Sequence, residues 1–250
     1  MTVEPAQKIG LARGLGNLFL GILLLLAVLA LLFGFRAFLY QPFNIPSGTM
    51  KPTLLVGDYI VVSKYAYGYS RYSFPGSSAP FAGRIFAGEP RHGDVVVFRL
   101  PRVPSTDYVK RLVGLPGDRI QMIKGALNLN GRPVKRERIE DFVETDASGR
   151  TTRGKQWRET LPNGASYVTL DLVDEGFYDN TPVYAVPAGH YFMMGDNRDN
   201  SQDSRMLSQV GYVPFENLIG RVERVIFSID NDSSSGGFPV RFERIGTAVR

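Results

Sequence analysis

An uncharged apolar segment near the N-terminus constrains this chain more than any other feature. Residues 15–35 read LGNLFLGILLLLAVLALLFGF. At a rise of 1.5 Å per residue, about 20 such residues cross a hydrocarbon core of roughly 30 Å. A secretory signal peptide has a shorter apolar core of about 7–15 residues, and no small-residue cleavage site follows this segment. We therefore expect residues 15–35 to form a retained transmembrane helix.

The flanking charges give a slight guide to orientation. Lys8 and Arg13 precede the apolar segment and Arg36 follows it, so the positive-inside bias is small. Because the preceding tail is short, we expect residues 1–14 in the cytoplasm and the rest of the chain on the outer side.

The composition excludes several classes of site. The chain has no cysteine, which rules out disulfides, thiolate nucleophiles and cysteine zinc sites. Its net charge of +5 comes without a zinc finger, a glycine-rich phosphate loop or a helix-turn-helix pattern. A basic domain close to anionic lipid headgroups explains the charge better than nucleic-acid binding. We expect membrane lipid as a partner, no nucleic acid, no cofactor and no metal.

Strand patterns dominate the rest of the chain. Short β-branched runs are bounded by Gly, Pro or Asp, and no amphipathic helical period of more than about three turns occurs. The expected strands are 58–64, 94–100, 108–114, 119–123, 126–129, 191–194 and 221–229. The predicted fold class is mainly β, with one transmembrane helix before a compact all-β domain.

Three segments depart from this strand pattern. The range 65–90 is rich in aromatic residues, Gly, Ser and Pro, and is either an ordinary loop or an aromatic surface at the membrane interface. Residues 132–160 carry charges of both signs and predict an exposed hairpin or loop. The tail from Asn231 begins DSSSGG after that residue, which predicts a loose end.

Two hydroxyl residues lie about ten residues beyond the apolar segment. In an extended segment Ser47 and Thr49 would point to one face. One hydroxyl could then attack a carbonyl while the other stabilises the oxyanion. Gly48 would allow a substrate chain to approach closely. A serine-threonine turn without chemistry is the alternative.

A lysine is the best available base for such a hydroxyl. His92 and His190 both lack the local context of a catalytic base, and nothing in the sequence supports a Ser-His-Asp triad. Lys110 shares a strand face with Tyr108 and Leu112, and burial there would lower its pKa by up to about 3–5 units. A neutral amine could remove a hydroxyl proton. The alternative is an ordinary solvated lysine.

A third segment, residues 194–205, is dense in Asp and Asn. Its spacing is not that of an EF-hand, and no bidentate Glu closes it. A network of Asx turns and Asp–Arg pairs is a better interpretation than a calcium loop.

Together these segments resemble bacterial signal peptidase I, a membrane-anchored Ser-Lys protease that removes signal peptides from exported preproteins. The matching boxes are 46–54 (PSGTMKPTL), 57–58 (GD), 93–98 (GDVVVF), 108–118 (YVKRLVGLPGD) and 195–205 (GDNRDNSQDSR). The resemblance implies a linker at 36–45, a catalytic domain at 46–230 with a β extension at 131–190, and a tail at 231–250. It also implies an outer, periplasmic location for the catalytic domain on the bacterial inner membrane.

The resemblance assigns roles residue by residue. Lys110 corresponds to the general base, and Ser201 would hold its amine by a hydrogen bond. Asp203 and Arg205 would form a supporting ion pair. Ser47 corresponds to the side-chain oxyanion donor, beside the backbone N–H of residue 49.

Further implied roles concern the substrate and the 195–205 box. Ile45 and Met50 would bind substrate, whose cleavage sites are of the Ala-x-Ala type. Asp196 and Arg198 would be structural members of the box.

One position departs from the family pattern Ser-x-Ser-Met, in which the serine before the methionine is the nucleophile. Thr49 stands there, and its extra methyl restricts χ1 and crowds the attack. Thr49 is the expected nucleophile of a working enzyme. Ser47 as the nucleophile and a weak or inactive relic are the alternatives.

Two other functions compete with this one. A membrane-anchored module could bind exported chains without cleaving them, but binding alone would not require Lys110. A self-cleaving Ser-Lys regulator is opposed by the membrane span and the lack of a DNA-binding domain. The oligomeric state is not predicted.

Overall fold

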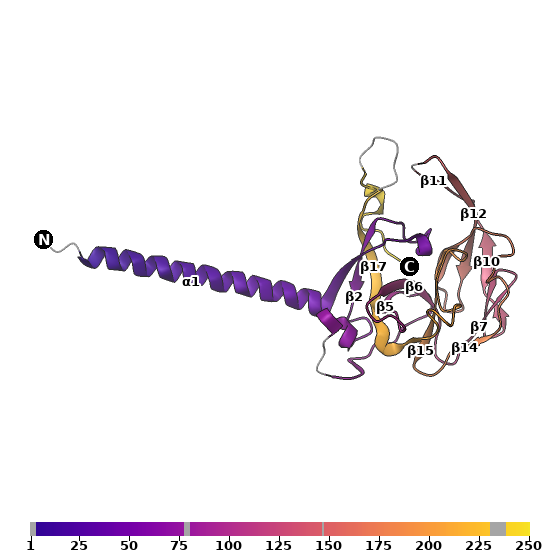
Figure 1. The fold of residues 1–250 in the computed structure, drawn as a ribbon, viewed down its shortest axis with the longest axis horizontal. Coiled ribbons are helices and arrows are strands. Elements are labelled where there is room, and N and C mark those ends of the chain that lie inside the picture. The colour runs from indigo at the N-terminus through magenta and orange to yellow at the C-terminus, as the bar shows by residue number, and fades with distance from the viewer. Residues whose placement is uncertain (1–3, 78–80, 147, 231–238) are drawn as a thin grey trace.

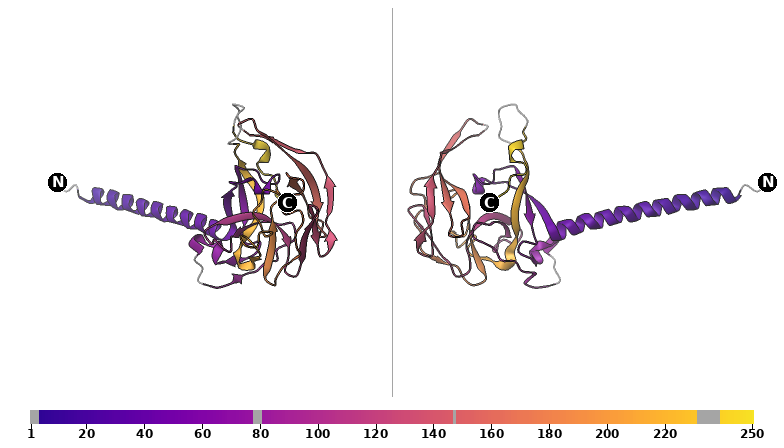
Figure 2. Two further views of the ribbon diagram at one scale, coloured as in Figure 1. Left: turned by 45° about the vertical axis from the view of Figure 1, so that its right-hand side comes forward. Right: turned by 180° about the vertical axis from the view of Figure 1, so that it is seen from behind.

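One long helix, α1 (Glu4–Gly34), projects from the β-rich remainder of the chain (Figures 1 and 2). This computed structural model describes residues 4–77, 81–146, 148–230 and 239–250. A short π-helix, Phe35–Leu39, continues α1. Residues Gly16–Leu39 are long and apolar enough to cross a membrane, and the most apolar stretch of that span is not buried within the protein. The apolar helix predicted for 15–35 is thus present.

The strands are antiparallel throughout and form four sheets. The main sheet has the order β1 (Tyr40–Asn44), β2 (Asp58–Ser63), β17 (Leu218–Ser228), β5 (Val95–Arg99), β6 (Asp107–Gly114), β15 (His190–Met194) and β16 (Val213–Pro214). A second has the order β14 (Tyr184–Ala185), β7 (Arg119–Ile123), β8 (Ala126–Leu129) and β9 (Arg132–Pro133). A third has the order β10 (Lys135–Arg138), β12 (Thr151–Thr160) and β11 (Phe142–Thr145), and β13 (Ser166–Asp171) also pairs with β12. The fourth pairs β3 (Tyr69–Ser70) with β4 (Arg84–Ile85).

Each of the seven predicted strands is present to within a few residues, which confirms the mainly β prediction. Sequence reasoning missed β1, β13 and the two-residue strands outside 132–160. Most of these carry few β-branched residues, and their pairing depends on partners elsewhere in the fold. Five one-turn 3-10 helices complete the described elements: Gly48–Met50, Arg71–Ser73, Pro75–Ser77, Phe215–Asn217 and Phe242–Arg244.

Strand β6 crosses the junction of the three hydrophobic clusters that make up the core. Its alternation places Val109, Leu112 and Val113 each against a different cluster. Lys110 lies in the same strand, directly opposite the fully buried Val96 of β5. The strand that carries the candidate base is therefore held by packing on both faces.

The sheet of β10 to β13 lies on the side of the molecule away from α1 (Figure 1). Strands β11 and β12 form the hairpin predicted within 132–160. The hairpin contacts the main domain through an ion pair between Lys51 Nζ and Glu144 Oε2, 2.5 Å apart.

The aromatic segment packs around the exit of the helix. Phe38 makes edge-to-face contacts with Tyr69 and Phe74, and the Tyr69 hydroxyl donates to the Phe38 carbonyl at 2.7 Å. The buried Lys64 amine donates to the Arg36 carbonyl at 3.0 Å, which ties strand β2 to the same turn. These contacts fix the end of the helix on the β domain.

The C-terminal segment is not the loose end that was predicted. Residues 231–238 lie outside the described residues, but 239–250 return to β17, where Val240 bridges Ile229. The Arg244 guanidinium pairs with the fully buried Asp58 carboxylate, at 2.8 Å from Nε to Oδ1 and 2.5 Å from Nη2 to Oδ2. The prediction failed because it was based on the Ser- and Gly-rich start of the tail. Arg244, further along the tail, neutralises the buried Asp58 carboxylate.

Arg244→Ala should therefore lower the free energy of unfolding by roughly 3 kcal/mol, because it leaves the Asp58 carboxylate buried without its counterion. Chemical denaturation in detergent would measure the change. The matched control is Arg132→Ala, at an exposed arginine of β9. Equal stability of the two variants would contradict the structural role of the C-terminal segment.

Candidate active site

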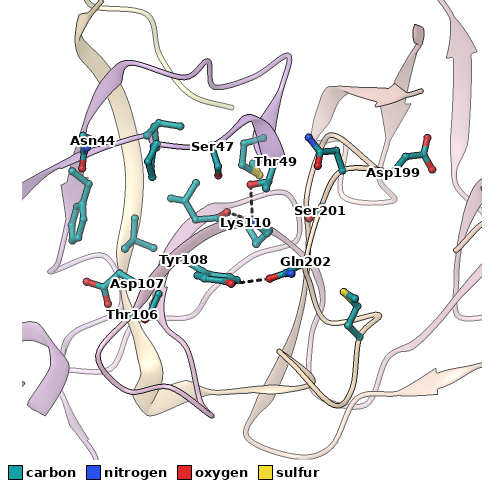
Figure 3. Close-up of a pocket in the computed structure, with 18 of the residues that line it drawn as sticks. Asn44, Ser47, Thr49, Thr106, Asp107, Tyr108, Lys110, Asp199, Ser201 and Gln202 are labelled. Atoms are coloured by element: carbon teal, nitrogen blue, oxygen red, sulfur yellow. Dashed lines mark hydrogen bonds between the residues drawn. The ribbon is translucent and has the colours of Figure 1, made fainter. Parts of the chain in front are cut away.

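A cleft of about 610 Å³ gathers the predicted site residues. It lies between the β1–β2 connection, strand β6 and the loop that follows β15 (Figure 3). Its walls include Ile45, Ser47, Thr49, Met50, Lys110 and Ser201, which are the six predicted catalytic and substrate-binding residues. Asp203 and Arg205 lie behind the wall, fully or almost fully buried.

Thr49 and Lys110 meet directly, although 61 positions separate them in sequence. Lys110 Nζ lies 2.7 Å from Thr49 Oγ1 and 3.0 Å from the Val109 carbonyl oxygen. The ammonium donates to the hydroxyl. Once it is deprotonated, the amine can accept the hydroxyl proton over the same short path. This geometry suits a hydroxyl nucleophile served by a lysine base.

The turn that carries Thr49 differs from the extended segment that was predicted. Ser47 is extended, but Gly48–Met50 form one turn of 3-10 helix, closed by a hydrogen bond from the Lys51 N–H to the Gly48 carbonyl at 3.2 Å. Ser47 and Thr49 still line the same cleft. The turn, rather than strand alternation, places the two hydroxyls together.

Asn197 fixes this turn, a contact with the Thr49 segment that was not predicted. Its backbone N–H donates to the Thr49 carbonyl at 3.1 Å, and its side-chain Nδ2 donates to the Gly48 carbonyl at 3.0 Å. Gly195 allows the close approach, because a Cβ there would lie 2.6 Å from the Thr49 carbonyl oxygen. Both contacts span almost 150 positions, so local patterns could not reveal them.

Lys110 is buried, with 3% of its surface exposed, so it is not the solvated lysine that was the alternative. Burial lowers the pKa of Lys110 from 10.5 to about 8. The Asp203 and Asp196 carboxylates oppose this shift, and the Arg205 guanidinium adds to it. A substantial fraction of the lysine is therefore neutral at slightly alkaline pH.

The expected ion pair behind the lysine is present. The Arg205 guanidinium donates to both Asp203 oxygens at 2.8 Å, from Nε and from Nη2. Burial alone would raise the pKa of Asp203, but the arginine and the Gly195 N–H hold it below its usual value. A charged carboxylate is therefore kept close to the lysine.

Ser201 lies in the cleft but does not make the hydrogen bond predicted for it. Its Oγ is buried and forms no hydrogen bond of ordinary geometry within the described part of the chain, although the hydroxyl helps to lower the pKa of the neighbouring Asp203 carboxylate. The hydroxyl packs against Gly195, where a Cβ would lie 2.2 Å from it. The lysine amine uses the Val109 carbonyl instead. A role for Ser201 toward Lys110 stays a prediction.

Two further ion pairs anchor the same loop. Asp196 receives two hydrogen bonds of 2.7 Å from the buried Arg111. Arg198 donates two hydrogen bonds to Glu159 of β12, at 2.9 and 2.6 Å. The predicted Asp–Arg network is thus present, but the partners Arg111 and Glu159 were missed because they lie 85 and 39 positions away.

The family profile and the sequence relatives that match this chain are signal peptidases. A family profile for signal peptidase, peptidase S26, matches residues 18–227. Signal peptidase I of Rickettsia typhi is 43% identical over 210 residues, which cover 79% of this chain and 77% of the relative. That of Rickettsia prowazekii is 42% identical over the same shares. Among solved structures, a signal peptidase I from Enterococcus faecalis V583 is 25% identical, with a TM-score of 0.31 over 53% of this chain and 96% of that chain.

Asp203→Asn should lower the pKa of Lys110 further below about 8, because the substitution removes a negative charge that favours the ammonium. The substitution also leaves the positive charge of Arg205 without its counterion, and this charge lowers the pKa of Lys110 as well. NMR titration of isotope-labelled lysine would measure the shift. A higher pKa for Lys110 in the variant would contradict this electrostatic assignment.

Proposed function

The chain belongs to the signal peptidase family, peptidase S26, and from this premise we propose that Thr49 is the nucleophile and Lys110 the general base of its reaction. Proteins of this type are serine-type endopeptidases that act on the signal peptides of preproteins. The observation that carries the proposal is the 2.7 Å contact between the buried lysine amine and the threonine hydroxyl within the cleft.

The proposed reaction proceeds in two steps. The neutral Lys110 amine takes the proton of Thr49 Oγ1 as this oxygen attacks the scissile carbonyl, and the ammonium then protonates the leaving amine. Water, deprotonated by the same amine, then hydrolyses the threonyl ester. This releases the signal peptide with a new C-terminal carboxyl group. The second step regenerates the hydroxyl.

Ser47 is the proposed oxyanion donor, together with the Thr49 N–H. The N–H groups at the start of a helical turn have no partner within that turn, and Ser47 immediately precedes Gly48–Met50. Ser47 is exposed in the cleft. Among the described residues, the Lys110 amine forms hydrogen bonds with Thr49 and with the Val109 carbonyl, and none with Ser47. This favours Thr49 over Ser47 as the nucleophile.

The proposed cleavage sites have small residues at −1 and −3, of the Ala-x-Ala type. Ile45 and Met50 line the cleft but are themselves almost fully buried in the hydrophobic core. We propose that shallow pockets for these substrate residues lie beside Ser47 and Thr49. A large side chain at these substrate positions would have to displace core residues.

The helix and the aromatic segment support a single-pass anchor. We propose that residues 1–14 are cytoplasmic and that the catalytic domain, 46–230 with its extension at 131–190, lies on the outer face. Exposed aromatic side chains near the helix exit, Phe35, Phe38 and Phe86, would contact the interfacial lipid. The anchor then holds the cleft at the surface where signal peptides emerge.

A panel of variants tests the nucleophile and the base. In detergent, the protein should cleave a preprotein after an Ala-x-Ala site, and Thr49→Ser should cleave as fast or faster. Thr49→Ala should be inactive, and Lys110→Ala should lose about 10²-fold or more. Ser47→Ala should lose about 10²–10³-fold.

The matched lysine control is Lys124→Ala, at an exposed residue outside the cleft, which should keep full activity. Full activity of Thr49→Ala with loss in Ser47→Ala would move the nucleophile to Ser47. Cleavage by Thr49→Ser alone would favour a module that binds exported chains but has lost catalysis.

The pH dependence tests the state of the base. Because only neutral Lys110 can accept the proton, kcat/KM should rise about tenfold per pH unit below an apparent pKa of about 8 and level off above it. Steady-state cleavage of a peptide substrate across this range would measure the profile. A kcat/KM that decreases as the pH rises from about 6 to about 8 would contradict a neutral lysine base.

A further inference from the structure

The cleft has a second half that the assigned residues do not use. In Figure 3, Asn44 and Ser47 lie on one side of the Thr49–Lys110 pair, and Gln202 and Asp199 lie on the other. The second half belongs to the loop after β15, together with Tyr178 from the connection between β13 and β14.

Position along the cleft determines which part of a substrate each half meets. An extended chain that places its scissile carbonyl at Thr49 runs past Ser47 on one side and past the loop after β15 on the other. Since Ile45, close to Ser47 in the sequence, is proposed to line the pocket for the residues before the scissile bond, the second half receives the first residues of the mature chain. This step rests on the proposed function.

Gln202 is the polar side chain best placed to form hydrogen bonds with those residues. Its side chain is exposed in the cleft. Its Oε1 accepts a hydrogen bond from the Tyr108 hydroxyl at 3.2 Å, which links the loop to β6. Because the oxygen is engaged, the amide Nε2 keeps its two N–H donors, and these make no hydrogen bond within the described residues.

The wall around Gln202 is well supported. Tyr108 lies 5.2 Å, ring centroid to Nζ, from Lys110, and Tyr178 lies 5.2 Å, ring centroid to guanidinium carbon, from Arg205. Both rings are thus fixed against buried cations of the site. The Gln202 amide, held by its hydrogen bond to Tyr108, therefore has a defined orientation in the cleft.

We propose that Gln202 is a specificity-determining residue for the mature side of the cleavage site. Its amide donates to a hydrogen-bond acceptor at position +1 or +2 of the preprotein, either a carboxylate, an amide oxygen or a hydroxyl. Preproteins with Asp, Glu, Asn or Ser at these positions are cleaved faster than those with Lys or Arg.

Gln202→Glu tests this inference because it keeps the shape and the Tyr108 contact but replaces the two donors with an acceptor. Peptides with one Ala-x-Ala site and Glu or Lys at +1 or +2 would be compared by kcat/KM. The ratio of Glu to Lys substrates should fall about fivefold or more in the variant, as expected for a lost hydrogen bond to a charged group. Gln202→Ala should reduce the ratio to an intermediate value.

Asn44→Ala, in the other half of the cleft, is the matched control. It should leave the ratio at +1 and +2 as it is. Unchanged ratios in Gln202→Ala, which removes the donors without adding a charge, would overturn the role of Gln202 and leave the proposed function standing, provided the enzyme is active. If neither the Thr49 protein nor Thr49→Ser cleaves any peptide, the proposed function fails, and the inference about Gln202 with it.

Discussion

The contact between a buried lysine amine and the Thr49 hydroxyl is the interaction on which the rest of this structure depends. Burial makes the lysine a usable base, since it lowers the pKa to about 8. The same burial is unfavourable for folding whenever the amine is protonated. The fold must therefore hold the lysine in place by other means. It does so with a strand packed on both faces and a loop that carries three buried arginine–carboxylate pairs.

The three ion pairs are better explained by how they position the loop than by a contribution to the stability of the fold. A buried ion pair contributes little net stability, because desolvation offsets most of the attraction, whereas removal of one partner is strongly destabilising. Here each guanidinium binds its carboxylate through two hydrogen bonds, which fixes both distance and orientation. Asp196, Arg198 and Asp203 thus pin one loop at three points, to β6, to β12 and to itself. The loop in turn holds the Thr49 turn through Asn197.

The parts of this arrangement that depend on local patterns were predictable from the sequence. The apolar run predicted the helix, and strand alternation predicted that Lys110 shares a face with Tyr108 and Leu112 but left its burial open. The ion pair of Asp203 with Arg205 joins residues two positions apart and was anticipated from the resemblance. Long-range partners were not predictable in this way. Arg111, Glu159 and Asn197 act across 39 to 149 positions, so only the folded topology reveals them.

Covalent capture would show whether Thr49, activated by Lys110, is the nucleophile. The protein would be mixed with an activated peptide ester ending in Ala-x-Ala, quenched in acid within the first turnover, and digested for mass spectrometry. The account predicts an acyl group on the peptide that carries Thr49, and no acyl group when Lys110 is replaced by alanine. An acyl group on Ser47 or Ser201, or equal labelling without the lysine, would contradict it.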